Sequence, residues 1–364
     1  MKKLMWLGVA LLAPLAAYLC LWPVPIDPVL WHPAPAPGYS GAHAVNQKLL
    51  GLHMIDLHGE VGPETVLAGP DGKLYTGLAS GRILRMQPDG SGQEIVANTG
   101  GRPLGLAFDG EGQLIVADAI KGLLSITPYA KVSVLANAVQ GKPILFADAV
   151  VIARSGKIYF TDATMRFSPA QWGGTLEAAT LDVLEQSATG RVLEYDPVNK
   201  AVRVLARGLS FANGIALSAN QSKLFVNESA RYRVWQIAVS ANELDVTQAS
   251  DQASVLLDNL PGYPDNLMRG PDGRIWLGLA GQRNDLDTMA EHPALRRLAM
   301  RLPRLFWNTP KPYGHVIAFG EDGKIVADLQ DPSGHSLLTT GATETAGRLY
   351  IHSIDGKGLG WLDR

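Results

Sequence analysis

Four oxygen-bearing side chains recur at matching positions in this sequence and could together bind a metal ion. They are Glu64, Asp148, Asn213 and Asp265. Each lies 10 or 11 residues ahead of a Leu or Ile at the centre of an apolar segment. Carboxylate and amide oxygens suit a hard divalent cation, and calcium suits them best because it accepts irregular geometry. Three like charges at one place would repel one another without a cation.

Turn and capping roles are the alternative explanation for these four residues. Asp and Asn are common at strand entrances, and any one of the four taken alone is better explained in that way. Their recurrence in matching registers favours a shared site.

A repeated pattern supplies the elements that would position these side chains. Six times, a short polar turn precedes an apolar strand centred on a Leu or Ile. The centres are Leu74, Leu114, Ile158, Leu224, Ile275 and Leu349. Their spacings of 40, 44, 66, 51 and 75 residues are typical of propeller blades with two long insertions. The sequence therefore predicts an all-β, six-bladed β-propeller, in which the mouths of the innermost strands surround one axial pocket.

The segment at 49–57, LLGLHMIDL, is predicted to complete the last blade, because the final repeat ends without an outer strand. A closed ring leaves no exposed strand edge. Two insertions have helical patterns, residues 168–187 in the third blade and 284–305 in the fifth. We interpret the second as a helix on the propeller rim, with a lid or a membrane-contacting patch as the alternative.

The composition limits the class of protein. The chain has 364 residues, of which 46% are hydrophobic and 18% charged, and its formal net charge is −2. These values fit one globular repeat domain, and the lack of a long basic run excludes nucleic acid as an expected partner. Cys20 is the single cysteine, which excludes an intramolecular disulfide and a cysteine-based metal site.

The N-terminus predicts attachment to a membrane or export. Lys2 and Lys3 precede apolar residues 4–22, a length just sufficient to cross a bilayer. Residues 1–22 are predicted as a signal anchor, with a cleaved signal peptide as the alternative. Residues 23–38 are predicted as a stiff, Pro-rich linker, and 39–364 as the propeller. The domain is then extracytoplasmic, either periplasmic or luminal.

Six sequence blocks resemble the strictosidine synthase-like family. They are GRPLGLAFDG (101–110), GKIYFTDAT (156–164), TGRVLEYDP (189–197), FANGIALS (211–218), PGYPDNL (261–267) and KPYGHVIAF (311–319). The resemblance extends over about residues 40–364. That family is grouped with the gluconolactonase/regucalcin and paraoxonase proteins, which are six-bladed, calcium-dependent propellers.

The resemblance implies a ligand set. It makes Glu64, Asn213 and Asp265 metal ligands, and Asp148 stands where relatives have Asn or Asp. Asn266 becomes a candidate extra contact. Paraoxonases carry acidic residues for a second calcium where this chain has Thr65 and Ala149. We therefore predict one divalent ion, calcium.

The resemblance also implies a reaction, hydrolysis of a lactone or of an aryl or alkyl ester, with Asp265 as the candidate catalytic base. Alternative bases are His58, His315 and His335. A different class of function is a non-catalytic propeller with a structural calcium and a partner-binding rim.

A third reading is a bond-forming enzyme of the synthase type. It is disfavoured because Thr340 stands near the position of the synthase glutamate, and Glu344 lies four residues away. Asp118 and Asp162 are expected to support loops, with Glu228 as a further candidate pocket residue. The sequence has no Gly-x-Ser-x-Gly elbow, P-loop or dinucleotide fingerprint.

Overall fold

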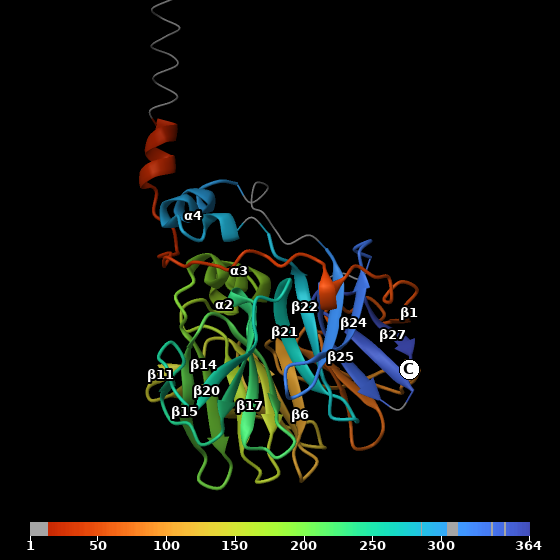
Figure 1. The fold of residues 1–364 in the computed structure, drawn as a ribbon. Helices are drawn as coiled ribbons and strands as arrows, with labels where there is room; N and C mark the ends of the chain where they lie inside the picture. The colour runs from red at the N-terminus through yellow and green to blue at the C-terminus, as the bar shows by residue number, and fades with distance from the viewer. Residues whose placement is uncertain (1–13, 285, 304–311, 336–337, 346) are drawn as a thin grey trace, which may run out of the picture.

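A computed structural model of the chain describes residues 14–284, 286–303, 312–335, 338–345 and 347–364. Six antiparallel blades form a propeller (Figure 1). The innermost strands contact one another in sequence around the axis, and the last, β25 (Thr339–Thr345), contacts the first, β2 (Val66–Ala68). The predicted six-bladed fold is thus confirmed.

The strands are listed from the axis outward. Blade 1 is β2, β3 (Leu74–Gly77), β4 (Arg82–Met86) and β5 (Glu94–Asn98), and blade 2 is β6 (Pro103–Phe108), β7 (Leu114–Asp118), β8 (Gly122–Ile126) and β9 (Val132–Ala136). Blade 3 is β12 (Ala147–Ile152), β13 (Ile158–Asp162), β14 (Gly190–Asp196), β15 (Ala201–Leu209) and β19 (Leu244–Asp245). Blade 4 is β16 (Ala212–Leu217), β17 (Lys223–Glu228), β18 (Arg233–Ala238) and β20 (Ala253–Leu257). Blade 5 is β21 (Gly262–Arg269), β22 (Ile275–Gln282), β23 (Gly314–Phe319) and β24 (Ile325–Asp331). Blade 6 is β25, β26 (Arg348–Ser353), β27 (Gly358–Asp363) and β1 (His53–Asp56), and a small hairpin joins β10 (Ala138–Val139) to β11 (Lys142–Pro143).

The ring is closed by the N-terminal strand. Strand β1 pairs antiparallel with β27, and Ile55 stands opposite Leu359. Ile55 is buried among the apolar side chains of blades 1 and 6, whereas its neighbour Met54 is 62% exposed. The prediction that the segment at 49–57 completes the last blade is confirmed.

The repeated Leu and Ile residues begin the second strand of each blade. Leu74 and Ile158, for example, are the first residues of β3 and β13. Each second strand forms a hairpin with the innermost strand, so a residue 10 or 11 positions earlier lies where the innermost strand starts. Apolar side chains packed between neighbouring blades, such as Leu224 and Val226, form the core.

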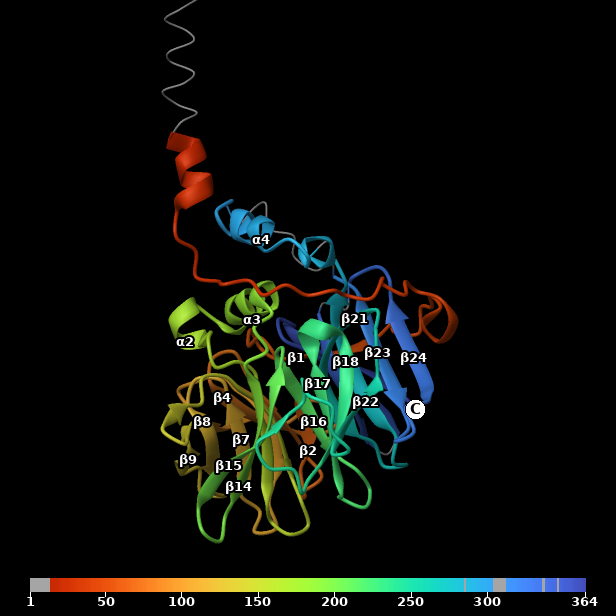
Figure 2. The same cartoon turned by 60° about the vertical axis from the view of Figure 1, so that its left-hand side comes forward.

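The helices lie on one face of the propeller. Helices α2 (Pro169–Trp172) and α3 (Thr175–Glu185) follow β13. The short helix η3 (Asp287–Met289) and α4 (Pro293–Met300) follow β22. Because β13 and β22 end where β12 and β21 begin, these helices gather over the mouths of the innermost strands (Figures 1 and 2). Both insertions are helical, as predicted; the remaining short helices are η1 (Gly41–His43) and η2 (Ser229–Arg231).

The N-terminal segment crosses the same face (Figure 1). Residues 14–21 are helical, and residues 23–39 form no helix or strand. The backbone nitrogen of Val29 donates to Glu185 O at 2.8 Å, and that of Trp31 donates to Ala290 O at 3.3 Å. The extended segment is therefore held against α3 and the η3–α4 insertion. In the described part of the chain, every helix is too short or too polar to span a bilayer; residues 1–13 of the predicted leader lie outside it.

Candidate metal centre

The four predicted ligands lie at equivalent places on four innermost strands. Glu64 directly precedes β2 by two residues, and Asp148, Asn213 and Asp265 lie near the starts of β12, β16 and β21. In these last three strands the pairing register shifts at the residue concerned, as in a β-bulge. A bulge leaves a residue unpaired and re-aims its side chain.

Glycines allow the innermost strands to approach closely at this level. A Cβ atom on Gly105 would lie 2.7 Å from Ala149 Cα, and one on Gly214 would collide with the backbone oxygen of Asp265. Strands packed this tightly bring residues from different blades together at the axis.

The side chains of all four residues are buried, and they interact with one another. Their exposed fractions are 2% for Glu64, 3% for Asp148, 5% for Asn213 and 8% for Asp265. Burial raises the pKa of Asp265 well above its ordinary value, and the negative charges of Glu64 and Asp148 raise it further. The same carboxyl group hydrogen-bonds with the side chains of Asn213 and Glu64. The structure thus brings the predicted residues of blades 1, 3, 4 and 5 together.

Burial also raises the pKa values of the other two carboxyl groups. For Asp148 the charge of Glu64 adds to the effect, so its pKa lies well above the ordinary value. Arg102 opposes both shifts, since its positive charge favours the ionised forms of Glu64 and Asp148. This arginine is itself 7% exposed, and its Nη1 donates to Gly62 O at 3.2 Å.

The donor set fits a calcium ion. Oδ1 of Asp265 and Oδ1 of Asn213 are buried and have no hydrogen-bond partner in the described structure. Buried polar atoms are usually satisfied, so these two oxygens are candidates for metal ligands. Within the described ranges, only one other set of three His, Cys, Asp or Glu residues, treated below, has all its ligand atoms within 4.8 Å of one another. The wider spacing of the axial carboxylates suits calcium, whose bonds of about 2.3–2.6 Å span more than those of transition metals.

Asn266 has a positioning contact with a predicted ligand. Its Nδ2 donates to Glu64 Oε1 at 2.5 Å and to Glu64 O at 3.1 Å. Thr340, from blade 6, donates to the same backbone oxygen at 2.6 Å. Glu64 is therefore oriented from two neighbouring blades. A direct contact between Asn266 and an ion stays a prediction.

Three acidic residues hold the turns that lead to the axis. Oδ1 of Asp118 accepts from the backbone nitrogen of Arg102 at 3.0 Å. Asp162 accepts from Phe146 N at 3.0 Å, and Glu228 accepts from Ser210 N at 2.8 Å. Each bonded nitrogen lies two or three residues before the axial position of its blade. The expectation that Asp118 and Asp162 support loops is confirmed, and Glu228 has the same role.

The candidate residues outside this cluster lie elsewhere. Glu344 accepts from Trp276 Nε1 at 2.7 Å and pairs with Arg364, at the end of β25 remote from Thr340. The synthase-type acid that the third reading requires is therefore not supplied by Glu344. His58 and His335 are at exposed positions, and His315 contacts Asp328 instead of the axial residues.

Sequence analysis missed the contribution of Arg102 and of the apolar residues beside the site. Arg102 lies 12 residues before Leu114 and so falls outside the spacing that identifies the axial residues. Phe146 and Phe211, each two residues before an axial ligand, pack edge to face at 5.3 Å. They belong to an apolar cluster with Leu181 of α3 and Ile26 of the N-terminal segment.

Six blades that bring three carboxylates and an amide to one axial position define a β-propeller with an oxygen-donor site. The chain belongs to the strictosidine synthase-like family. Its residues 41–86 match the family model described as "Strictosidine synthase-like, N-terminal", and residues 148–242 match "Strictosidine synthase". The adipocyte plasma membrane-associated protein of Salmo salar is 31% identical, over 99% of this chain and 89% of that protein. Strictosidine synthase-like 7 of Arabidopsis thaliana is 33% identical, over 73% of this chain and 69% of that protein.

Solved structures share the fold at low sequence identity. A gluconolactonase from Xanthomonas campestris superposes with a TM-score of 0.59 and 17% identity, covering 93% of this chain and 98% of that one. The calcium-binding protein regucalcin from Agrobacterium tumefaciens superposes with a TM-score of 0.55 and 14% identity, covering 84% and 92%. At these identities the likeness shows the propeller architecture alone.

Proposed function

We propose that this protein is a calcium-dependent hydrolase of lactones or of aryl or alkyl esters. One ion is held by Glu64, Asp148, Asn213 and Asp265. The observation that carries the proposal is the pair of unpartnered buried oxygens, Oδ1 of Asp265 and Oδ1 of Asn213, among three carboxylates. The gluconolactonase name of one structural neighbour and the calcium-binding name of another support the same chemistry.

The ion would supply Lewis acidity toward the carbonyl oxygen of a bound ester or lactone. Asp265 is the group that accepts a proton from the attacking water, because burial and neighbouring charge raise its pKa and so its proton affinity. The water oxygen bonds to the carbonyl carbon, the ester C–O bond breaks, and the proton passes to the leaving oxygen. Asn266 and Thr340 keep Glu64 in place during these steps.

The apolar cluster beside the site favours apolar substrates. Phe146 and Phe211 immediately precede two of the ligand positions, and both are 5% exposed or less. Aromatic side chains there can bind the acyl or aryl part of an ester and keep bulk water from the reacting carbonyl. We therefore expect aryl esters and alkyl-substituted lactones to be better substrates than small polar ones.

The experiment is hydrolysis of phenyl acetate and a panel of lactones by the purified protein, with and without a calcium chelator. We expect turnover that is lost on chelation, returns with added calcium, and falls at least about 100-fold in Asp265→Asn. Glu344→Gln is the matched control, since Glu344 is a carboxylate bonded far from the axis, and it should retain activity.

The opposite result would favour the second function, a non-catalytic propeller with a structural calcium. In that case chelation would lower the thermal stability while no substrate is turned over at any calcium concentration.

We further propose that the protein is membrane-anchored or exported, with the propeller extracytoplasmic. The apolar sequence of residues 4–22 supports attachment, as does the name of the plasma membrane-associated relatives. Leu21 and Trp22 are 78% and 59% exposed, which leaves apolar surface for lipid. Alkaline extraction of membranes and protease protection test this. Release by alkali without proteolytic processing, or a protected propeller on the cytoplasmic side, would contradict it.

A further inference from the structure

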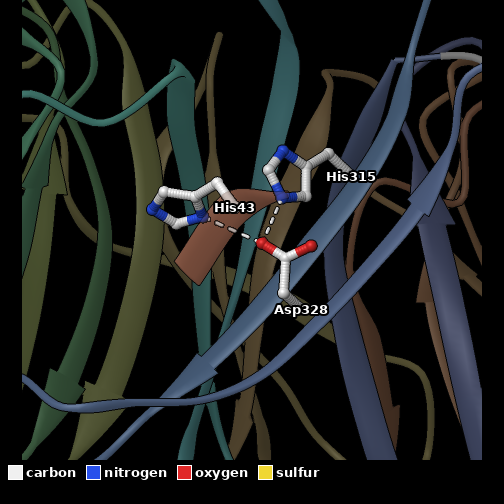
Figure 3. Close-up of side chains that lie close together, drawn as sticks. All are labelled: His43, His315 and Asp328. Carbon is white, nitrogen blue, oxygen red and sulfur yellow. Dashed lines mark hydrogen bonds and ion pairs between the residues drawn. The ribbon is translucent and has the colours of Figure 1, made fainter. Parts of the chain in front are cut away.

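Two histidines and an aspartate form a second cluster, away from the axial residues (Figure 3). Nδ1 of His43 lies 2.8 Å from Oδ2 of Asp328, and Nε2 of His315 lies 2.9 Å from the same oxygen. The three ligand atoms all lie within 4.8 Å of one another. The residues come from three elements: His43 from η1, His315 from β23 and Asp328 from β24.

We propose that His43, His315 and Asp328 form a zinc site. Imidazole nitrogen and carboxylate oxygen are ligands that zinc accepts, at about 2.0–2.2 Å. Bonds of that length in tetrahedral geometry place neighbouring ligand atoms roughly 3.3 Å apart, close to the spacing seen here. Calcium, by contrast, takes oxygen ligands. This cluster and the axial cluster share no residue, so each is selective for a different ion.

The carboxylate of the cluster is held in place by two amides. Oδ1 of Asp328 accepts from Asn46 Nδ2 at 2.9 Å and from Gln330 Nε2 at 2.5 Å, which leaves Oδ2 directed at the histidines. Contacts of this kind orient metal ligands and tune their affinity. Hydrogen bonding within the trio also leaves Nδ1 of His315 buried without a partner in the described structure, so it does not satisfy the cluster fully.

The burial of the three side chains gives an ion one side from which to enter. The exposed side-chain fraction is 1% for His315, 8% for Asp328 and 15% for His43. With three protein ligands, water can occupy the fourth position of a tetrahedral ion. That position lies on the more exposed, His43 side.

A zinc ion here would join the N-terminal segment to the outer strand of blade 5. The segment already contacts β24, since Gln330 Nε2 donates to His43 O at 3.2 Å and Leu49 N donates to Gln330 O at 3.1 Å. Ligation of His43 would hold the segment about ten residues before β1 closes the ring. Zinc binding is therefore expected to stabilise the ordered segment as well as the propeller.

The test is titration of metal-stripped, full-length protein with zinc chloride in a calcium-containing buffer. We expect one equivalent of zinc to bind and to raise the melting temperature, and cobalt(II) in its place to give the visible absorption of a tetrahedral site. His43→Gln should weaken zinc binding at least about 100-fold and abolish the cobalt spectrum while the circular dichroism is unchanged.

Two controls separate this site from others. His58→Gln removes an exposed histidine that lies 3.7 Å from Asp56 on the same segment, and Asp265→Asn alters the axial cluster. Both variants should bind zinc as the wild type does. Failure of the wild type to bind zinc, or binding that His43→Gln leaves unchanged, would overturn the proposal. Loss of zinc binding in Asp265→Asn alone would also overturn it, because the ion would then occupy the axis.

Discussion

At the scale of single residues, the chemistry of the axis depends on which side chain each blade contributes. Six equivalent positions face one another there, and they hold three carboxylates, one amide, one hydroxyl and one apolar side chain. In blade order they are Glu64, Leu104, Asp148, Asn213, Asp265 and Thr340. The apolar and hydroxyl positions lie on blades 2 and 6, next to Glu64. The acceptor oxygens are therefore concentrated on blades 1, 3, 4 and 5.

We predict that Asn266→Leu weakens calcium binding about 10-fold or more, with a similar loss in kcat/KM. The substitution removes the amide that donates to Glu64 Oε1 at 2.5 Å, so the carboxylate loses its fixed orientation. Calorimetric titration with calcium measures the effect. Asn199→Leu is the control, because Asn199 is exposed in a turn between β14 and β15. Equal calcium affinity in Asn266→Leu and wild type would contradict the positioning role.

The axial residues could be predicted from sequence because each belongs to a repeated hairpin whose length fixes the spacing. Arg102 and the His43–His315–Asp328 cluster could not. Arg102 lies two residues outside the repeat register, and His43 comes from a segment that belongs to no repeat. Non-repeating segments take positions set by tertiary packing, which the period of a repeat does not encode.

At the scale of elements, the helical insertions and the N-terminal segment form a cover over the mouths of the innermost strands. Arg296 of α4 joins its three parts. It is 2% exposed, and it donates to Leu184 O of α3 at 2.9 Å, to Ala290 O at 2.9 Å and to Val29 O of the N-terminal segment. The sequence predicted helices in these insertions, but not that the linker would pack between them.

We predict that Arg296→Met loosens this cover. Three backbone oxygens lose a buried charged donor, which costs roughly 2–4 kcal/mol. Limited proteolysis should then cut residues 23–38 much faster than in the wild type. Arg297→Met is the matched control, because Arg297 is 40% exposed and pairs with the exposed Asp27, and its cleavage rate should change little. Equal protection of the segment in Arg296→Met would show that this arginine does not hold the cover.

A buried carboxyl in α3 makes the stability of the protein depend on pH. Burial raises the pKa of Asp182 to about 7, and the charge of Glu185 adds to the effect. Between its ordinary pKa of 3.8 and about 7, the folded protein holds a proton that the unfolded chain has released. The free energy of unfolding therefore decreases as the pH rises through this interval.

We predict that Asp182→Asn removes this dependence. An amide cannot ionise, so the variant should be more stable than wild type at pH 8, by roughly 2–4 kcal/mol, and about equal to it near pH 4. Denaturant unfolding at the two pH values measures the difference. A variant that is less stable than wild type at pH 8 would mean that the ionised carboxylate is stabilised in the folded protein.

At the scale of the whole molecule, the propeller depends on closure between the two ends of the chain. The period of the repeats predicted the number of blades, and the missing outer strand of the last repeat predicted which segment completes it. What the sequence did not show is the route of the chain from the leader to β1, across the face that carries the axial site (Figure 2).

We predict that Ile55→Asp opens the ring whereas Met54→Asp does not. Both residues lie in β1, but Ile55 is 6% exposed and Met54 is 62% exposed. A charge buried at position 55 would cost several kcal/mol, free the edge of β27 and promote aggregation. Size-exclusion chromatography and thermal unfolding compare the two variants. Similar behaviour of both would argue that β1 contributes little to closure.

The central claim is that residues of four blades hold one calcium ion at the axis. The most direct test is a crystal structure of the protein grown with calcium, with the ion identified by its anomalous scattering. We predict one ion whose ligands include Glu64, Asp148, Asn213 and Asp265. An axis without an ion under saturating calcium, or an ion bound elsewhere while these four side chains point apart, would contradict the account.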